Sequence, residues 1–385
     1  MPERNKQILI VAGEASADRY GAALARQLQT LRGEDTLRFW GAGGDAMRQA
    51  GVELLAHVRD LGQIGPREVI SGLRAYYNVF RRIVNRVEKE PPDVAVLLDF
   101  PDFNLRLAKK IKRRNVKVVY YISPQVWAWR GGRVRAIRKY VDKMLVILPF
   151  EEAYYRERGV DAAFVGHPLL EDFHPVADRR RFLESLELNP EQKTVALLAG
   201  SRRKEIEYIL PVMLSSARLL ANRVPVQFLI SAAPTVDLKQ IQRIAQANLG
   251  AEDMNLFRIV TQNSRDILAN VDFAFVKSGT SALEAALVGV PFLITYKISA
   301  LSWRVGSLLI RAPFKGLPNL LAGKRVVPEL FQYEATPEAL AQTAWDYLEY
   351  PEKCATMRTE LGKIRNQLSA ICASKAVAAV ISGYL

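Results

Sequence analysis

The chain has 385 residues, of which 49% are apolar and 24% are charged, a composition typical of a folded globular protein. This length exceeds what one ordinary hydrophobic core supports, so we expect two domains of roughly 150–200 residues each. The sequence has no apolar run of about 18 residues and no signal-peptide pattern, which argues against a transmembrane helix and against secretion. The cysteines and histidines form no zinc-type cluster, and we expect reduced thiols, no metal site and no cofactor.

The net charge of +14 is concentrated in one segment. Between Arg106 and Lys143 there are thirteen lysines and arginines against one acid, Asp142. Such a segment favours a polyanion, which would be nucleic acid, an anionic membrane surface or a phosphorylated ligand. A solvated helix face explains part of this charge, but such a face would normally mix both signs. We therefore expect the segment to have a function.

Predicted strands and helices alternate through the first half of the chain. Strands are expected at residues 8–13, 38–44, 93–100, 118–122 and 144–150. Helices are expected at residues 17–31, 106–113, 134–140 and 151–158, together with a short helix that follows the second strand and ends by residue 51. The apolar runs VAVLL and KVVYYI do not alternate with polar residues, as expected for parallel strands buried on both faces. This order predicts a doubly wound α/β sheet.

The second half begins after a proline-rich stretch, which we interpret as a linker at residues 171–190. Further strand segments follow it: KTVALLAGSR, VQFLISAA, LFRIVTQ, VDFAFVKSGT and PFLITYKI. We expect one domain at residues 1–170, a second at 191–340 and closing helices at 341–385. A proline-interrupted loop is expected at 317–330, before those helices.

The segment YYISPQVWAWR, residues 120–130, is the most informative stretch. Its strand ends at a Ser-Pro pair, because proline forbids the strand to continue. The following turn places Trp127, Trp129 and Arg130 near the carboxyl edge of the sheet, where open α/β sheets bind ligands. Two indole faces and a forked guanidinium suit an amphiphilic or sugar-bearing anion. The alternative is a strand end followed by a pair of core tryptophans.

The turn AGEASAD follows the first predicted strand. It lacks the G-x-G-x-x-G fingerprint, which disfavours a nicotinamide cofactor. Its small residues let a ligand approach the helix amino terminus beside Glu14 and Ser16, where free N–H groups attract anions or sugar hydroxyls. A plain Ser or Asp helix cap is the alternative.

The segment LLDFPDFN places Asp99 at the carboxyl end of a buried strand. Burial raises the pKa of a carboxyl group, so Asp99 suits a general base. Asp102 is expected to cap the following helix, and Asn104 is expected to contact an acceptor sugar at this turn.

Two turns in the second half are predicted to bind a nucleotide. In AGSRRKEI, the backbone N–H groups of Gly200 and Ser201, together with Arg202, would hold a diphosphate and stabilise it as a leaving group. The alternative is a surface charge run. The P-loop signature is absent, so ATP hydrolysis is not supported.

The second of these turns is KSGTSALEAAL. Ser278, Gly279 and Thr280 offer hydroxyl and amide donors at a helix start, and Glu284 would accept hydrogen bonds from a ribose diol. A serine cap that makes Glu284 part of a capping box is the alternative. Further on, Asn319 in LPNLLAG is expected to contact the ligand.

Two further patterns concern metals and membranes. No D-x-D pair occurs, which disfavours a metal-held nucleotide sugar, so bond cleavage would rely on Arg202, amides and helix dipoles. Residues 64–84 and 301–318 combine apolar residues with basic ones. Such stretches suit a helix lying on anionic lipid, with a core-packed helix as the alternative.

Seven motifs, taken in order, closely resemble those of the lipid-A-disaccharide synthase family. They are GEASAD, DFPDFN, YYISPQVWAW, ILPFE with FVGHPL, LLAGSR, SGTSALE and LPNLLAG, and they cover nearly the whole chain. Two departures are Ala17, where the family usually has glycine, and Ala199, where a proline usually precedes the GSR turn. Both are small residues, so we expect adjusted loops. The resemblance implies a GT-B architecture, with two Rossmann-like domains facing a cleft and carboxyl-terminal helices packing back.

The resemblance also implies a reaction. A 2,3-diacylglucosamine unit would pass from its UDP donor to 2,3-diacylglucosamine 1-phosphate, forming a β(1→6) bond with inversion and releasing UDP. Asp99 would be the base, Arg202 would bind the diphosphate, and Glu284 and Asn319 would hold the nucleotide. The basic segment suits these lipid substrates at an anionic inner membrane. We therefore expect a cytoplasmic protein, peripheral on the inner face of the inner membrane, and a homodimer.

Rival functions explain less of the sequence. A UDP-N-acetylglucosamine epimerase or the peptidoglycan glycosyltransferase would keep the nucleotide turns but would not account for YYISPQVWAW. A nucleic-acid-binding protein would use the basic segment, but it would leave Asp99 and Glu284 without a role. No recognised nucleic-acid-binding motif is present, so we expect no nucleic-acid partner.

Overall fold

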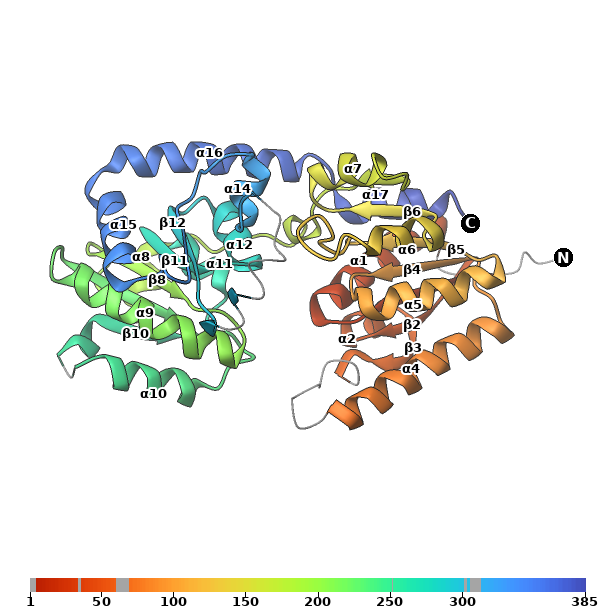
Figure 1. Cartoon of the computed structure of the whole chain (residues 1–385), viewed down its shortest axis with the longest axis horizontal. Coiled ribbons are helices and arrows are strands. Elements are labelled where there is room, and N and C mark those ends of the chain that lie inside the picture. Colours follow the sequence, from red (N-terminus) through yellow and green to blue (C-terminus); the bar gives the residue numbers. More distant parts are fainter. Residues whose placement is uncertain (1–4, 34–35, 60–68, 251, 301–302, 305–312) are drawn as a thin grey trace. The chain divides into compact units, whose positions relative to one another are not determined.

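The apolar runs of the sequence form two parallel sheets, each belonging to its own unit. The computed structural model describes residues 5–33, 36–59, 69–250, 252–300, 303–304 and 313–385. Unit 1 consists of Met1–Asp172 and Leu368–Leu385, and unit 2 consists of Phe173–Gln367 (Figure 1). The last residues of the chain therefore belong to the same unit as the first.

Unit 1 has seven parallel strands in the order β3-β2-β1-β4-β5-β6-β7. The strands are β1 Lys6–Ala12, β2 Leu37–Gly43, β3 Val52–His57, β4 Val94–Leu98, β5 Lys117–Tyr121, β6 Lys143–Val146 and β7 Ala162–Phe164. The helices are α1 Ala15–Arg32, α2 Asp45–Gln49, α4 Val69–Lys89, α5 Pro101–Ile111, α6 Arg133–Tyr140, α7 Pro149–Arg156 and α17 Ala373–Ser382.

Alternate residues of the central strand β1 face two separate apolar layers. Leu9 and Val11 belong to the layer formed with side chains of α4, α5, α6 and α7. Ile8 and Ile10 belong to the layer formed with α1, α2 and α17. Because successive side chains of a strand point to opposite faces, helices cover both faces of this sheet. The predicted doubly wound fold is confirmed.

Unit 2 has six parallel strands in the order β10-β9-β8-β11-β12-β13. The strands are β8 Lys193–Leu198, β9 Val226–Ser231, β10 Phe257–Val260, β11 Phe273–Lys277, β12 Phe292–Tyr296 and β13 Glu329–Phe331. The helices are α8 Arg179–Glu184, α9 Arg203–Ala221, α10 Leu238–Asn248, α11 Ser264–Ala269, α12 Thr280–Val288, α14 Leu317–Ala322, α15 Pro337–Glu349 and α16 Pro351–Ser369. The strand order reverses between β8 and β11, and such a switch point opens a crevice for ligands.

Several short elements differ from those predicted. The prediction of a loop at 317–330 is wrong, because helix α14 and the start of strand β13 form there. Helix α8 lies inside the segment 171–190 that we interpreted as a linker, and strands β3 and β7 were not predicted. The strand expected at 144–150 ends at Val146, because Pro149 begins helix α7, a position where a missing N–H costs nothing.

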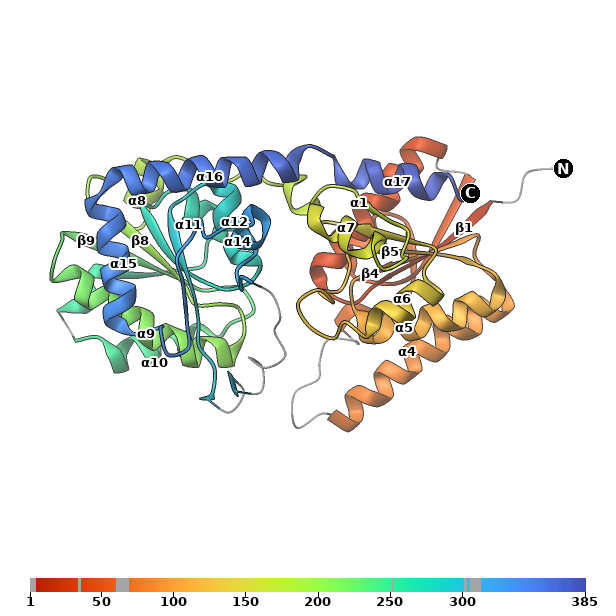
Figure 2. The same cartoon turned by 45° about the horizontal axis from the view of Figure 1, so that its top comes forward.

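The carboxyl-terminal helix α17 packs against α1 in unit 1 (Figure 2). Val377, Ala378 and Ile381 lie in the apolar layer that also contains side chains of α1. Arg32 on α1 donates to the hydroxyl of Ser382 at 2.6 Å and also to its carbonyl. The predicted packing back of the closing helices is therefore confirmed.

Helix α4 corresponds to the first amphipathic stretch of the sequence. Tyr76 and Phe80 contact the ring of Phe103 edge-to-face, with centroids 5.0 and 5.5 Å apart, and Ile83 is fully buried. Tyr77 is 59% exposed. Most of the apolar side chains described on this helix therefore pack in the core of unit 1, which was the alternative to a helix lying on anionic lipid.

The second amphipathic stretch, residues 301–318, lies mostly outside the described residues. Within the ranges that the structure covers, none of the helices combines the length and apolarity needed to cross a membrane.

Candidate functional site

The carboxyl ends of β1 and β4 meet closely at one edge of the unit 1 sheet. The two strands pair in parallel, with Ala12 opposite Leu98. A Cβ atom on Gly13 would lie 2.3 Å from the ring of Phe100, so this approach requires glycine. The turns that follow the two strands, which carry two of the predicted site carboxylates, are therefore neighbours.

Asp99 has an unusual backbone conformation directly after β4. Its φ is 46° and that of Phe100 is 47°, in the left-handed region that residues other than glycine rarely adopt. The N–H of Asp99 donates to the carbonyl of Tyr121 at 3.0 Å, and its carbonyl accepts from the hydroxyl of Tyr120. The same carbonyl accepts from Nδ2 of Asn104 at 2.8 Å. Because Asn104 is fully buried, we interpret it as a residue that positions this turn.

The carboxylate of Asp99 is suited to accept a proton near neutral pH. Burial raises the pKa of Asp99 to about 6, and the negative charge of Glu14 acts in the same direction. The N–H of Phe100 acts in the opposite direction, and no cation of the described residues contributes. A partly buried carboxylate without an ion-pair partner among the described residues fits the chemistry of a general base.

The turn after β1 presents Glu14 and Ser16. Glu14 is exposed at the N-cap of α1, and its carboxylate accepts from the hydroxyl of Ser16 rather than from the helix backbone. The alternative of an Asp helix cap applies to Asp18, but the helix that this residue caps is α2 and not α1. The buried Asp18 carboxylate accepts from Gly44 at 2.6 Å and from Met47 at 3.1 Å, which fixes the start of α2.

Trp129 and Arg130 are exposed in the turn after β5. The guanidinium of Arg130 lies 4.6 Å from the ring centroid of Trp129, which is 44% exposed. Arg130 and Arg133 both pair with the carboxylate of Asp102. The predicted capping role of Asp102 is wrong: Phe100 occupies the N-cap of α5 without a side-chain hydrogen bond.

Glu151, which the sequence analysis missed, anchors the turn that carries Trp127. It is 1% exposed, and its carboxylate accepts from the hydroxyl of Ser123 at 2.7 Å and from the indole N–H of Trp127 at 2.9 Å. The backbone N–H of Leu148 donates to the same carboxylate at 3.2 Å. Burial raises the pKa of Glu151 to about 7, although these hydrogen bonds lower it. An acid beside a strand end in ILPFE was the signal available in the sequence.

In unit 2, the turn after β8 combines a strained glycine with an exposed arginine. Gly200 has a φ of 117°. Arg202 is the N-cap of α9, and its side chain is 81% exposed, with the Glu205 carboxylate at 3.4 Å. The carbonyl of Ser201 accepts from the hydroxyl of Thr235 at 2.9 Å. An exposed guanidinium at a helix amino terminus suits an anion.

The turn after β11 lies beside the turn after β8, because the two strands are neighbours in the sheet. Gly279 is the N-cap of α12 with a φ of 138°, and Thr280 is its exposed first residue. The hydroxyl of Ser278 donates to the carbonyl of Lys315 at 3.3 Å. The first amides of α12 therefore adjoin the turn of Arg202.

Glu284 forms contacts with helix α11. Its carboxylate accepts from the hydroxyl of Ser264 at 2.9 Å and pairs with Arg265 at 3.2 Å. The capping-box alternative is wrong, because α12 begins at Thr280 and has Gly279 as its N-cap. Glu284 lies a full turn further along the helix.

Asn319 is fully buried in α14. Its Oδ1 accepts from the N–H groups of Val326 at 2.7 Å and Val327 at 2.9 Å. Its Nδ2 donates to the carbonyl of Val327 and to Glu329, both at 2.8 Å. These bonds use the full capacity of the amide, so we interpret Asn319 as a residue that positions the segment before β13.

Part of the basic segment forms an exposed cationic surface. Among the described residues, seven of its side chains are exposed and form no ion pair: Arg106, Lys109, Lys110, Arg113, Arg135, Arg138 and Lys139. Others are paired, as Lys112 is with Asp142. The free cations lie on α5, the turn after it, and α6, and the two helices contact each other. We call this set the basic surface.

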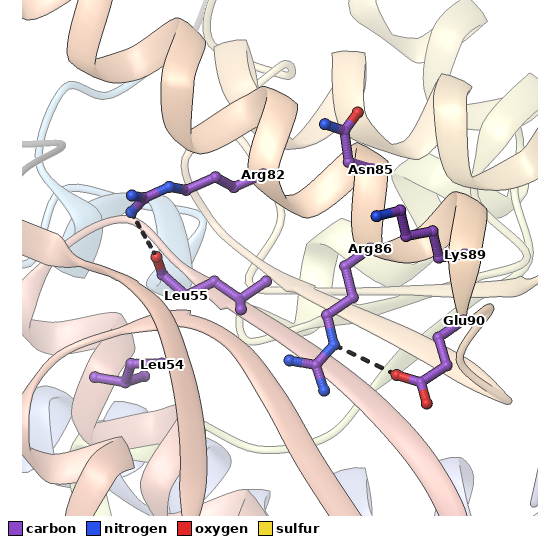
Figure 3. Close-up of a pocket in the computed structure, with 7 residues that line it drawn as sticks. All are labelled: Leu54, Leu55, Arg82, Asn85, Arg86, Lys89 and Glu90. Atoms are coloured by element: carbon purple, nitrogen blue, oxygen red, sulfur yellow. Dashed lines mark hydrogen bonds and ion pairs between the residues drawn. The ribbon is translucent and has the colours of Figure 1, made fainter.

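A pocket of about 780 Å³ lies between β3 and α4 (Figure 3). It is lined by Leu54, Leu55, Arg82, Asn85, Arg86, Lys89 and Glu90. Arg82 donates to the carbonyl of Leu55 at 3.3 Å, and Arg86 pairs with Glu90 at 3.6 Å and with Glu53. The pocket contains none of the predicted site residues, and two of its cations already have partners within the chain.

The sequence matches the model of a known protein family. The family described as "Lipid-A-disaccharide synthetase" matches residues 8–381. A lipid-A-disaccharide synthase of Syntrophus aciditrophicus is 44% identical over 366 residues, covering 94% of each chain. One of Geobacter metallireducens is 40% identical over 378 residues, covering 98% of this chain and 97% of the relative.

Solved structures share the fold at low sequence identity. UDP-GlcNAc 2-epimerase from Neisseria meningitidis, bound to UDP-GlcNAc, has a TM-score of 0.65 at 13% identity and covers 98% of this chain and 100% of its own. The glycotransferase of kitacinnamycin has a TM-score of 0.64 at 14% identity, with full coverage of both chains. These likenesses identify the two-unit fold as GT-B.

Proposed function

The chain belongs to the lipid-A-disaccharide synthase family of glycosyltransferases, and we propose that it catalyses the reaction for which that family is named. It would transfer 2,3-diacylglucosamine from UDP-2,3-diacylglucosamine to 2,3-diacylglucosamine 1-phosphate. The products would be a β(1→6)-linked disaccharide 1-phosphate and UDP. Sequence identity over nearly the full length of both relatives supports the proposal.

In the proposed mechanism Asp99 is the general base. It takes the proton of the acceptor hydroxyl while the hydroxyl oxygen attacks the anomeric carbon, and the bond from that carbon to the UDP oxygen breaks. Attack from the face opposite the leaving group inverts the configuration. The single observation that carries this role is the geometry of Asp99: a partly buried carboxylate, held by its backbone at a strand end and free of cationic partners in the described residues.

The leaving diphosphate is assigned to the two neighbouring turns of unit 2. Arg202 supplies charge, and the amides of Gly200, Ser201 and the first turn of α12 supply fixed dipoles. Such donors stabilise the charge that develops on a leaving group. Ser278, Thr280 and Glu284 complete the proposed nucleotide contacts, and Asn319 positions the segment beside them.

The acceptor is assigned to the unit 1 edge. The turns after β1 and β5, the two strands that flank β4, carry Glu14, Ser16, Trp127, Trp129 and Arg130, which offer carboxylate, hydroxyl, indole and guanidinium groups. Asn104 is buried and holds the turn of Asp99 in place through its side-chain hydrogen bond. The rings suit apolar chains or a sugar face, and the guanidinium suits a phosphate.

The basic surface is proposed to hold the protein on anionic lipid. It suits a cytoplasmic protein that is peripheral on the inner face of the inner membrane and takes its phosphorylated lipid acceptor there. Binding to anionic vesicles should fall as salt rises, since surface charges are screened. A homodimer is also proposed, and sedimentation of the purified chain would test it.

The reaction is tested by UDP release from UDP-2,3-diacylglucosamine in detergent micelles, with and without 2,3-diacylglucosamine 1-phosphate. Release that depends on the acceptor, with a disaccharide product, is the expected result. Conversion of UDP-N-acetylglucosamine to its C2 epimer, with UDP still attached and no acceptor present, would favour an epimerase instead. A chain that binds no UDP would overturn the proposal.

A further inference from the structure

An ion pair lies at the switch point of the unit 2 sheet, between β8 and β11. Nζ of Lys277, the last residue of β11, is 3.0 Å from Oε1 of Glu205 in the first turn of α9. The two side chains are 18% and 7% exposed. The pair therefore joins the two turns that the proposed function assigns to the diphosphate.

The surroundings of Glu205 indicate more than a link between two turns. Its Oε1 also accepts from Arg202 at 3.4 Å, so one oxygen contacts both cations. Its Oε2 is buried without a hydrogen-bond partner in the described part of the chain, and it would lie 2.6 Å from a Cβ on Gly200. A buried carboxylate that is only half satisfied is costly for stability.

Lys277 is placed to use its remaining N–H groups outside the pair. An ammonium has three donors, and the ion pair with Glu205 occupies one of them. Nζ would lie 3.2 Å from a Cβ on Gly279, so it lies directly beneath the glycine at the start of α12. The ring of Tyr296 lies 5.6 Å from the same nitrogen. The cation thus adjoins the amides of a helix amino terminus, where an anion would be favoured.

We propose that Lys277 is a second cationic contact for the diphosphate of bound UDP, and that Glu205 positions Lys277 and Arg202 toward it. This inference rests on the proposed function, because it takes UDP as the ligand. It names two residues, far apart in the sequence, that meet only in the folded unit. The competing explanation is a structural pair that merely holds the two turns together.

The test compares UDP with uridine, which lacks the diphosphate, by calorimetric titration of the full chain. Lys277→Met should weaken UDP binding by about 10- to 100-fold, the range of a lost charge-assisted hydrogen bond, and leave uridine binding unchanged. Lys277→Arg should retain most of the UDP affinity. Thermal unfolding of each variant reports whether it is folded.

The double variant Lys277→Met/Glu205→Gln separates the two explanations. It removes the carboxylate that Lys277→Met alone would leave buried and unpaired. If Lys277 contacts the diphosphate, the double variant stays weak for UDP. Restored UDP affinity, or an equal loss of uridine and UDP binding in Lys277→Met, would overturn the inference. Wild-type chain that binds no UDP would overturn the proposed function itself, which is a different result.

Discussion

The carboxyl edges of the two sheets have the same architecture and opposite chemistry. In unit 1 the turns after β1 and β4 bring Glu14 near Asp99, and burial raises the pKa of Asp99 to about 6. In unit 2 the turns after β8 and β11 bring Arg202 and Lys277 to the single carboxylate of Glu205. In the proposed function, the first edge accepts a proton and the second binds an anion.

This difference shows that the doubly wound sheet supplies a position and the turn residues supply the chemistry. At both edges a glycine without a side chain allows a neighbouring side chain to approach the turn closely. Gly13 allows contact with Phe100 in unit 1, and Gly200 allows contact with Glu205 in unit 2. The charges placed at these contacts differ in sign, and on this difference rests our proposal of a base at one edge and a phosphate site at the other.

The largest expected effect is the loss of the base in unit 1. Asp99→Asn should lower acceptor-dependent UDP release by about 100- to 10,000-fold, the range for general-base catalysis, while UDP binding is retained. Asp161→Asn is the control, because the side chain of Asp161 is 60% exposed and pairs with Lys143 at 2.7 Å, away from the proposed site residues. Normal turnover of Asp99→Asn would move the base to another group, with Glu14 and Asp102 the next candidates.

The second prediction concerns the pH dependence of stability in unit 1. Because the pKa of Glu151 in the folded chain is about 7, above its ordinary 4.5, ionising it costs stability. That cost is absent below about pH 4.5 and fully present above about pH 7, where it reaches about 3 kcal/mol. Glu151→Gln should therefore lose less stability than wild type between pH 5 and pH 8 in denaturant unfolding.

A matched control for Glu151 is its neighbour Glu152. The Glu152 carboxylate pairs with Arg156 at 2.6 Å and is not fully buried. Glu152→Gln should keep the wild-type dependence on pH. Parallel curves for Glu151→Gln and wild type would show that folding does not raise the pKa of Glu151.

The third prediction weakens the anion-binding edge of unit 2. Arg202→Ala should lower UDP affinity by about tenfold, since a charge-assisted hydrogen bond is lost at an exposed position. Arg203→Ala is the control, because that neighbour pairs with Glu207 at 3.1 Å on the following turn. Titration calorimetry measures both, and unchanged affinity in Arg202→Ala would move the diphosphate away from this turn.

The smallest expected effect sharpens the account of Asp99. Wild-type turnover should rise with pH through about 6, because the base must be ionised to accept a proton. Glu14→Gln removes a negative charge that raises the pKa of Asp99, so the midpoint should shift to lower pH. Glu53→Gln, on edge strand β3, should leave the midpoint unchanged. A profile that does not move in Glu14→Gln would remove Glu14 from the electrostatics of the site.

The positions of the proposed site residues could be predicted from the sequence where they depend on strand ends. Asp99, Arg202 and Gly279 each follow a long apolar run, so their place at the edge of a parallel sheet could be derived from one strand alone. Long strands with apolar runs were predicted well for the same reason. The three-residue strands β7 and β13 have too few residues for a pattern.

The partners of side chains could not be derived in this way. Glu151 meets Trp127 only because β5 and β6 pair, and Lys277 meets Glu205 only because β8 and β11 pair. Asn319 looked like a polar loop residue, yet its amide is fully buried and bonded within the chain. Side-chain direction at a turn depends on tertiary contacts that no local pattern contains.

The membership of α17 in unit 1 has a consequence for synthesis on the ribosome. Unit 2 is one continuous stretch, Phe173–Gln367, and all of it leaves the ribosome before α17 does. Unit 1 is translated first, but α1 lacks its apolar partner, with Val377 and Ile381, until all of unit 2 has been translated. Of the two units, the one whose sequence comes first is therefore completed second, and a nascent chain must carry the exposed face of α1 while unit 2 is synthesised.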